Sequence, residues 1–97
     1  MALTIVATIT AKPGYVEKVR QELLMLIAPT LQEAGCLQYD LHQDNENPSV
    51  FLFFENWSSR EEWLNHMESP HLLAHRAATT EMVESIEIRE MSQLSRE

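Results

Sequence analysis

Cysteine and basic residues are scarce in this 97-residue chain. Cys36 is the only cysteine, so no intrachain disulfide can form, which favours a reducing compartment. Seven Lys and Arg face 15 Asp and Glu, giving a formal net charge of -8, and no local basic cluster offsets this excess. Such a chain repels phosphate backbones and anionic headgroups. We therefore expect neither nucleic acid nor a membrane as a partner.

Long apolar runs and glycine-rich loops are also missing. No apolar stretch approaches the ~18 residues that a membrane-spanning helix needs. Residues 1–6 lack a basic segment, and Thr8 and Thr10 interrupt the apolar run that follows, which is typical of a strand rather than a signal peptide. We expect a cytoplasmic protein. With only two glycines and no cysteine cluster, the sequence offers no phosphate loop and no cluster site, and we expect no cofactor.

Four segments have the composition of strands. Residues 3–11 are rich in β-branched side chains, and residues 36–44 alternate apolar and polar side chains. Residues 49–57 are apolar in both registers, which is typical of a strand covered on both faces. A last strand is expected within residues 82–92.

Helices are predicted between these strands. Apolar residues from 16 to 31 recur every three or four positions, and Gly35 follows as a left-handed cap. Pro29 should kink this helix because it lacks an N–H. Residues 58–62 contain overlapping capping boxes that start a second helix, and Ser69 followed by proline restarts it.

The predicted order is strand, helix, strand, strand, helix pair, strand. It indicates one domain over residues 1–97 with an α+β, ferredoxin-like split β-α-β-β-α-β fold and a four-stranded antiparallel sheet. Helices can cover only one face of this sheet, yet the third strand is apolar on both. An exposed apolar sheet face favours association, so we predict a homodimer joined through that face.

One set of residues resembles a known family. Glu55 and Trp57 close the third strand, His66 follows nine residues after the tryptophan, and His71 follows Ser69-Pro70. With Pro13-Gly14 and the segment at 34–39 (AGCLQY), this pattern resembles the antibiotic biosynthesis monooxygenase family, and within it the short quinol-monooxygenase-like members. The resemblance extends from about residue 3 to residue 90.

The resemblance implies a dimeric α+β barrel with a small cavity between sheet and helices in each subunit. It also implies oxygenation of hydroxylated aromatic compounds by dioxygen without metal, flavin or haem. Haem-degrading relatives carry an asparagine on the first strand beside a tryptophan and a histidine. The corresponding residues 6–8 here are Val-Ala-Thr, so haem breakdown is disfavoured.

Two residues are candidates for catalysis. Oxygenation without a cofactor needs a base that removes a phenolic proton in a dry site. His66 fits by residue type, because histidine titrates near neutral pH. Alternatively, it packs against the sheet and bonds a backbone carbonyl. Glu55 lies on a strand face with aromatic residues; it either orients His66 or His71, accepts a substrate proton, or makes a buried structural hydrogen bond.

Four further residues are candidates for substrate binding. Trp57 and Phe53 could stack on an aromatic ring, Tyr39 could donate a hydrogen bond to a bound oxygen, and His71 would lie nearby. Trp57 and Tyr39 could equally be core residues. His71 and His75 have a spacing that can chelate a metal, but the sequence shows no third ligand, and we expect no metal site.

Three functions remain open from the sequence. The first is a cofactor-independent monooxygenase that oxidises a small quinol or hydroxylated aromatic substrate with dioxygen. The second is an isomerase that moves protons on a small oxygenated metabolite with the same His and Glu. The third is a non-catalytic module that binds a small aromatic ligand.

Overall fold

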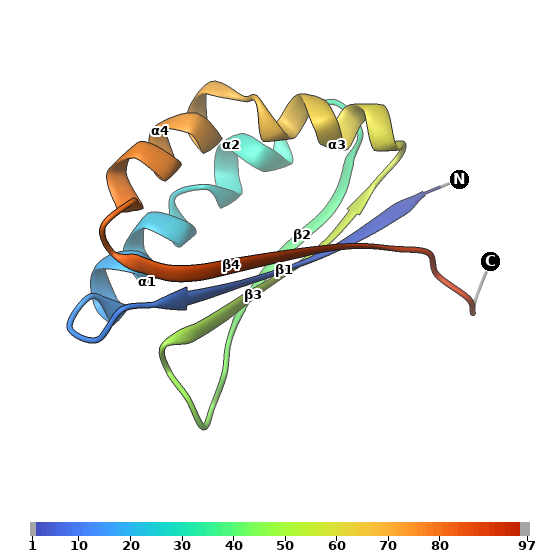
Figure 1. The fold of residues 1–97 in the computed structure, drawn as a ribbon. Helices are drawn as coiled ribbons and strands as arrows, with labels where there is room; N and C mark the ends of the chain where they lie inside the picture. Colours follow the sequence, from blue (N-terminus) through green and yellow to red (C-terminus); the bar gives the residue numbers. More distant parts are fainter. Residues whose placement is uncertain (1, 96–97) are drawn as a thin grey trace.

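A computed structural model describes residues 2–95, and its elements follow the predicted order (Figure 1). The eight elements are β1 (Leu3–Ala11), α1 (Val16–Leu24), α2 (Ile27–Leu31), β2 (Cys36–Gln43), β3 (Val50–Trp57), α3 (Arg60–Met67), α4 (Pro70–Thr79) and β4 (Val83–Met91).

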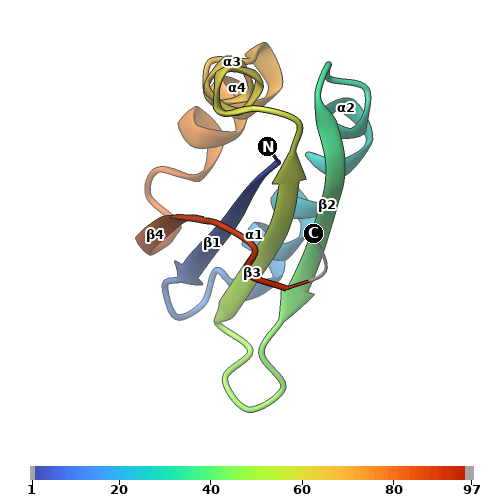
Figure 2. The same cartoon turned by 90° about the vertical axis from the view of Figure 1, so that its right-hand side faces the viewer.

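The four strands form one antiparallel sheet in the order β2-β3-β1-β4 (Figure 2). All four helices lie on the same side of this sheet (Figure 1). The predicted ferredoxin-like α+β fold is therefore confirmed for the chain itself. No helix within residues 2–95 has the length and apolar character needed to cross a bilayer.

Local capping signals correctly predicted where α3 and α4 start. The Ser59 hydroxyl accepts a hydrogen bond from the Glu62 N–H at the start of α3. Ser69 caps α4 in the same way, and Pro70 occupies the first helical position. These caps fix the two helices that carry His66 and His71.

The helix predicted over residues 16–31 is in fact two helices, with a break at Met25 and Leu26. Pro29 has no N–H to donate to the carbonyl of residue 25, four positions earlier. The chain therefore leaves the α-helical pattern one turn before the proline. Leu26 instead donates to the Leu23 carbonyl at 3.1 Å, and α2 begins at Ile27.

The core lies between the helices and one face of the sheet. Side chains on this face come mainly from the two central strands; the buried ones are Ile5, Ala7, Ile9, Ala11, Phe51, Phe53, Glu55 and Trp57. The opposite face of β3 carries Val50, Leu52 and Phe54, which are only half-buried. The third strand is thus apolar on both faces, as expected, but this chain covers only one of them.

The edge strand β4 is covered least. Ile86 and Ile88 pair with Ile9 and Ala7 of β1 and therefore face the helices. They are nevertheless 53% and 41% exposed, because the helices do not reach over this edge. The space between sheet and helices is consequently open beside β4.

We predict that Gly35→Ala lowers the free energy of unfolding by at least about 2 kcal/mol. Gly35 has φ +84°, a conformation that costs an L-residue roughly 1–2 kcal/mol. A Cβ there would also lie 2.6 Å from Glu62 Cβ and 2.7 Å from Ser58 Oγ. Urea unfolding measures the change.

Gly14→Ala is the matched control, because Gly14 has φ +88° with nothing within 4 Å of the added Cβ. Its free energy of unfolding should fall only by the cost of the backbone conformation, roughly 1–2 kcal/mol. Equal losses for the two variants would show that the contact between Gly35 and α3 does not matter.

Candidate active site

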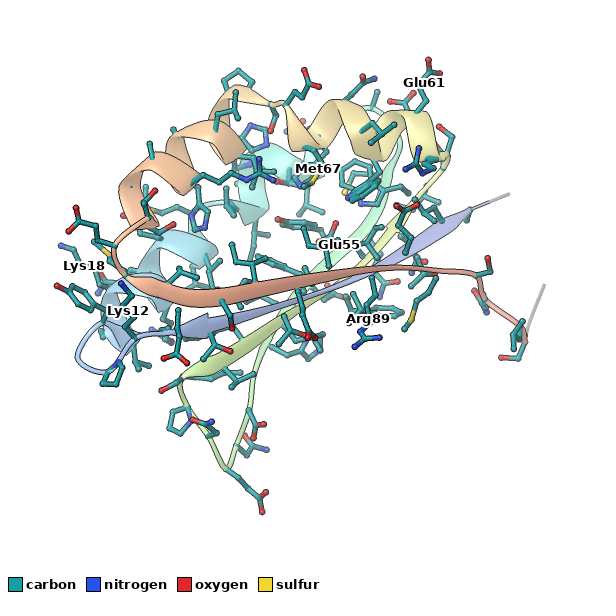
Figure 3. All side chains as sticks on the ribbon, in the orientation of Figure 1. Lys12, Lys18, Glu55, Glu61, Met67 and Arg89 are labelled. Carbon is teal, nitrogen blue, oxygen red and sulfur yellow. The ribbon has the colours of Figure 1, made fainter. Side chains whose placement is uncertain are left out.

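A cavity of about 70 Å³ lies between the sheet and the helices. Figure 3 labels Glu55 of β3 and Met67 of α3, which line it from the sheet and from the helix layer. Apolar side chains form most of this inner cavity, and its polar lining comprises Tyr39, Glu55, His66, His75 and Arg76. An apolar lining with a few polar groups is typical of a small-molecule site.

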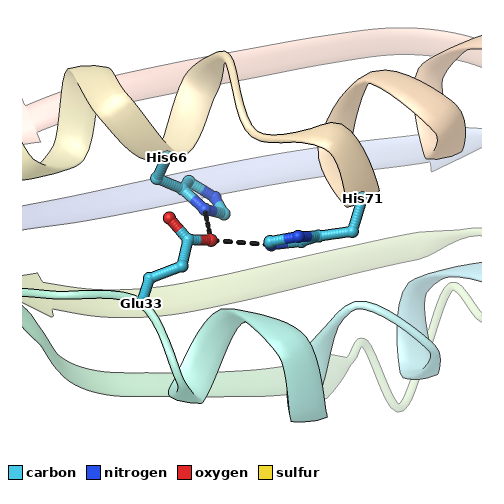
Figure 4. A group of neighbouring side chains, drawn as sticks. All are labelled: Glu33, His66 and His71. Atoms are coloured by element: carbon cyan, nitrogen blue, oxygen red, sulfur yellow. Dashed lines mark hydrogen bonds and ion pairs between the residues drawn. The ribbon is translucent and has the colours of Figure 1, made fainter.

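Glu33 joins two histidines beside this cavity (Figure 4). Its Oε2 lies 2.7 Å from His66 Nδ1 and 2.7 Å from His71 Nε2. Glu33 belongs to the loop between α2 and β2, while the histidines come from α3 and α4. One carboxylate oxygen therefore connects three segments that are distant in the sequence.

His66 is neutral at neutral pH in this environment. The residue is 2% exposed, and burial lowers the pKa of its ring below the ordinary value, although the hydrogen bond and charge of Glu33 oppose this shift. A neutral ring that donates Nδ1–H to Glu33 carries its lone pair on Nε2. Within residues 2–95, Nε2 has no hydrogen-bond partner. His66 is thus a neutral imidazole with a fixed orientation and a free Nε2.

Aromatic rings surround His66. The Trp57 ring lies 4.8 Å from it and the Tyr39 ring 5.6 Å, edge-on. Trp57 is fully buried and is not among the residues that line the inner cavity. Its Nε1–H donates to Glu55 Oε1 at 2.9 Å. The structure therefore places Trp57 behind the cavity, where it supports both His66 and Glu55.

Glu55 and Tyr39 have pKa values shifted by burial. Burial raises the pKa of Glu55 from 4.5 to about 7, opposed by the hydrogen bond from Trp57 and reinforced by the charge of Glu33. Burial, together with the negative charge of Glu55, raises the pKa of Tyr39 far above its ordinary value. The Tyr39 hydroxyl thus keeps its proton, and its ring stacks on Phe53 at 4.4 Å.

The structure brings most of the predicted site residues together, but it changes their connections. His66 and His71 share Glu33, whereas Glu55 bonds Trp57 and neither histidine. Sequence reasoning did not identify Glu33. The available signal was a carboxylate two positions before Gly35, the glycine that turns the chain into β2 beside α3.

His71 and His75 do not form a chelating pair with a third ligand in the described residues. The ligand atoms of Glu33, His66 and His71 instead lie within 4.8 Å of one another. Two hydrogen bonds of 2.7 Å already use the Glu33 oxygen, and an ion could bind only if both opened. The arrangement as it stands is a hydrogen-bonded relay.

Comparison with known proteins places this arrangement in a family. The sequence model described as "Antibiotic biosynthesis monooxygenase" matches residues 2–78. The chain belongs to this family. The matched range includes Glu33, His66 and His71 of the relay, and also Glu55.

Individual relatives agree with this family. The chain is 32% identical over 81 residues to "Putative monooxygenase Rv0793" of Mycobacterium tuberculosis, covering 84% of this chain and 79% of that protein. The crystal structure of PA3566 from Pseudomonas aeruginosa has a TM-score of 0.93 at 37% identity and covers 97% of this chain and 95% of its own. The structure of Rv0793 has a TM-score of 0.91 at 27% identity and covers 99% and 98%.

We predict that Glu55→Gln flattens the pH dependence of stability. Between about pH 4.5 and about pH 7, folded Glu55 holds a proton that the unfolded chain has released. The free energy of unfolding therefore falls as pH rises through this window. Glutamine cannot titrate, but its amide oxygen can still accept from Trp57.

In the wild type this fall should amount to roughly 3–4 kcal/mol, because the pKa rises from 4.5 to about 7 and one pKa unit corresponds to ~1.4 kcal/mol; in the variant the fall should be absent. Urea unfolding at several pH values measures it, with the exposed Glu61→Gln as control. His66 is present in all three proteins, so the difference isolates Glu55. Parallel pH curves for the wild type and Glu55→Gln would contradict the raised pKa.

Proposed function

We propose that this family member is a cofactor-independent monooxygenase that oxidises a small quinol or hydroxylated aromatic compound with dioxygen. The observation that carries the proposal is the buried His66, held by Glu33 through Nδ1 at 2.7 Å so that Nε2 is left as the base. The monooxygenase names of relatives support the reaction class.

In the proposed reaction, His66 Nε2 removes the proton of a substrate hydroxyl. The resulting anion is electron-rich and reduces dioxygen, so that one oxygen atom bonds to a ring carbon and the other leaves as water. A quinol then becomes a hydroxyquinone: the substrate loses four electrons, and dioxygen gains four. The substrate thus supplies all the electrons that the reaction needs.

The other polar groups have distinct proposed roles. Tyr39 keeps its proton and can donate a hydrogen bond to the negative charge that develops on the substrate or on oxygen. Glu55, with a pKa of about 7, can hold or release a second proton near neutral pH. Phe53, stacked on Tyr39, forms an aromatic wall of the cavity.

An isomerase is the second candidate, and one observation favours it. His66 and Glu55 line the same cavity; the neutral His66 ring can accept a proton, and Glu55, with a pKa of about 7, can hold or release one near neutral pH. Two such groups are sufficient to move a proton between positions of a small oxygenated metabolite. This reaction would consume no dioxygen.

We also propose that the chain acts as a homodimer joined through the open face of the sheet. Val50, Leu52 and Phe54 are half-buried on this face, and the helices of residues 2–95 all lie on the other face (Figure 1). A second copy would bury this apolar surface by twofold symmetry.

We predict that His66→Gln lowers oxygen uptake with a hydroquinone panel by roughly 10²–10⁴-fold, the usual contribution of a positioned base. Glu33→Gln should lower oxygen uptake less, because it leaves His66 Nε2 in place and removes only the carboxylate that orients the ring. The exposed Glu61→Gln is the control and should match the wild type.

Wild-type turnover of a quinol by His66→Gln, accompanied by a lower melting temperature, would show that His66 is only structural. Proton exchange into a substrate without oxygen uptake would favour the isomerase. Saturable binding with no turnover of any kind would favour a binding module.

For the dimer, we predict a solution mass of two chains by light scattering at micromolar concentration. Phe54→Lys places a charge on the open face and should yield monomers, whereas Leu73→Lys changes an exposed apolar residue on α4 and should not. A monomeric wild type would refute the proposal.

A further inference from the structure

A second cavity of about 320 Å³ adjoins the first, between the end of α4 and β4. His75, Arg76 and Ile86 line both cavities. The inner and outer cavities are therefore adjacent along the uncovered edge of β4, and these three residues mark the junction between them. A ligand with an aromatic ring in the inner cavity would extend past them toward solvent.

Arg76 at this junction lacks a carboxylate partner. Of the four arginines in residues 2–95, Arg20, Arg60 and Arg89 each form an ion pair with a glutamate. Arg76 instead places Nη2 3.9 Å from Met67 Sδ, which is a weak acceptor. In a chain with a net charge of -8, a cation that stays unpaired beside a cavity is available to a ligand.

The positive charge of Arg76 reaches the interior of the site. Burial is the main cause that lowers the pKa of both His66 and His75, and Arg76 contributes a smaller lowering to each. Glu33 opposes the shift at His66, and the charge and backbone carbonyl of Glu22 oppose it at His75. Glu84 also lines the outer cavity, but it forms no ion pair with Arg76 in the described structure. Arg76 is therefore the group at the junction that can pair with an anion, while Glu84 and Glu22 are the carboxylates near it.

His75 adds an unmet hydrogen-bonding group at the same place. Its Nδ1 is buried and has no partner among residues 2–95. An unpaired buried polar atom costs free energy, so a ligand atom that bonds it gains affinity. His75 and Arg76 are adjacent in sequence and line the same junction, which lets one polar ligand group contact both.

We propose that Arg76 and His75 form a subsite for the carboxylate of an aromatic acid whose ring occupies the inner cavity. Arg76 supplies the charge and His75 Nδ1 the second contact. The substrate class is then a hydroxylated aromatic acid. This inference rests on the proposed function for the reacting end of the substrate, but its own test is by binding.

The test compares two ligands that differ only in the carboxylate, dihydroxybenzoate and catechol, by titration calorimetry. The wild type should bind the acid about tenfold more tightly, roughly the contribution of one charge-assisted contact to the exposed Arg76. Arg76→Gln should abolish this preference by weakening the binding of the acid far more than that of catechol. Arg76→Lys, which keeps the charge but loses the planar fork, should retain part of it.

Arg20→Gln is the matched control, because it makes the same charge change at an arginine already paired with Glu17 on α1. It should keep the tenfold preference. Equal affinity of the wild type for both ligands, no saturable binding of the acid, or an equal loss in Arg20→Gln and Arg76→Gln would each overturn the subsite. Circular dichroism confirms that each variant is folded.

The two proposals fail separately. If the acid binds preferentially through Arg76 but no oxygen is consumed, the monooxygenase is wrong and the subsite stands. If catechol and the acid bind with equal affinity and both are oxidised, the monooxygenase stands and the subsite is wrong.

Discussion

Glu33 Oε2 accepts hydrogen bonds from the side chains of two helices, each at 2.7 Å, and the rest of the site depends on this shared atom. The Glu33 side chain is 16% exposed, and the His66 side chain only 3%. The contacts are therefore shielded from water. In such a shielded environment, hydrogen bonds to a charged group are strong. They join the α2–β2 loop to α3 and α4, so the packing of three segments and the orientation of the base have the same origin.

The same arrangement resolves a conflict between burial and charge. A buried histidine without a partner would cost free energy, and a buried carboxylate without a donor would cost more. When the two lie together, the histidine N–H donates a hydrogen bond to the carboxylate. The ring then remains neutral with a defined tautomer. Glu55 and Trp57 repeat this arrangement on β3, where the indole N–H satisfies a carboxyl group that burial favours in its protonated form.

The sequence predicted the parts of the structure that are encoded locally. Ser59, Ser69 and Gly35 act within a few residues of the element ends that they define, and the alternation in β2 and β3 places Tyr39, Phe53 and Glu55 on the helix-facing side. The partner of His66 could not be found in this way, because Glu33 lies 33 residues earlier and meets it only through tertiary packing. The helix break lies one turn before the kink predicted at Pro29, because the missing N–H of Pro29 leaves the carbonyl four residues earlier without its donor.

The uncovered edge of β4 has an evolutionary consequence. Ile86 and Ile88 contribute to the wall of the inner cavity while remaining largely in contact with solvent. Substitutions at such positions usually change stability little, because they neither empty nor overfill a packed core. Cavity shape can therefore diverge among descendants of this chain while the relay beneath the helices is preserved. The β4 edge is where mutation can explore new ligands at least risk to folding.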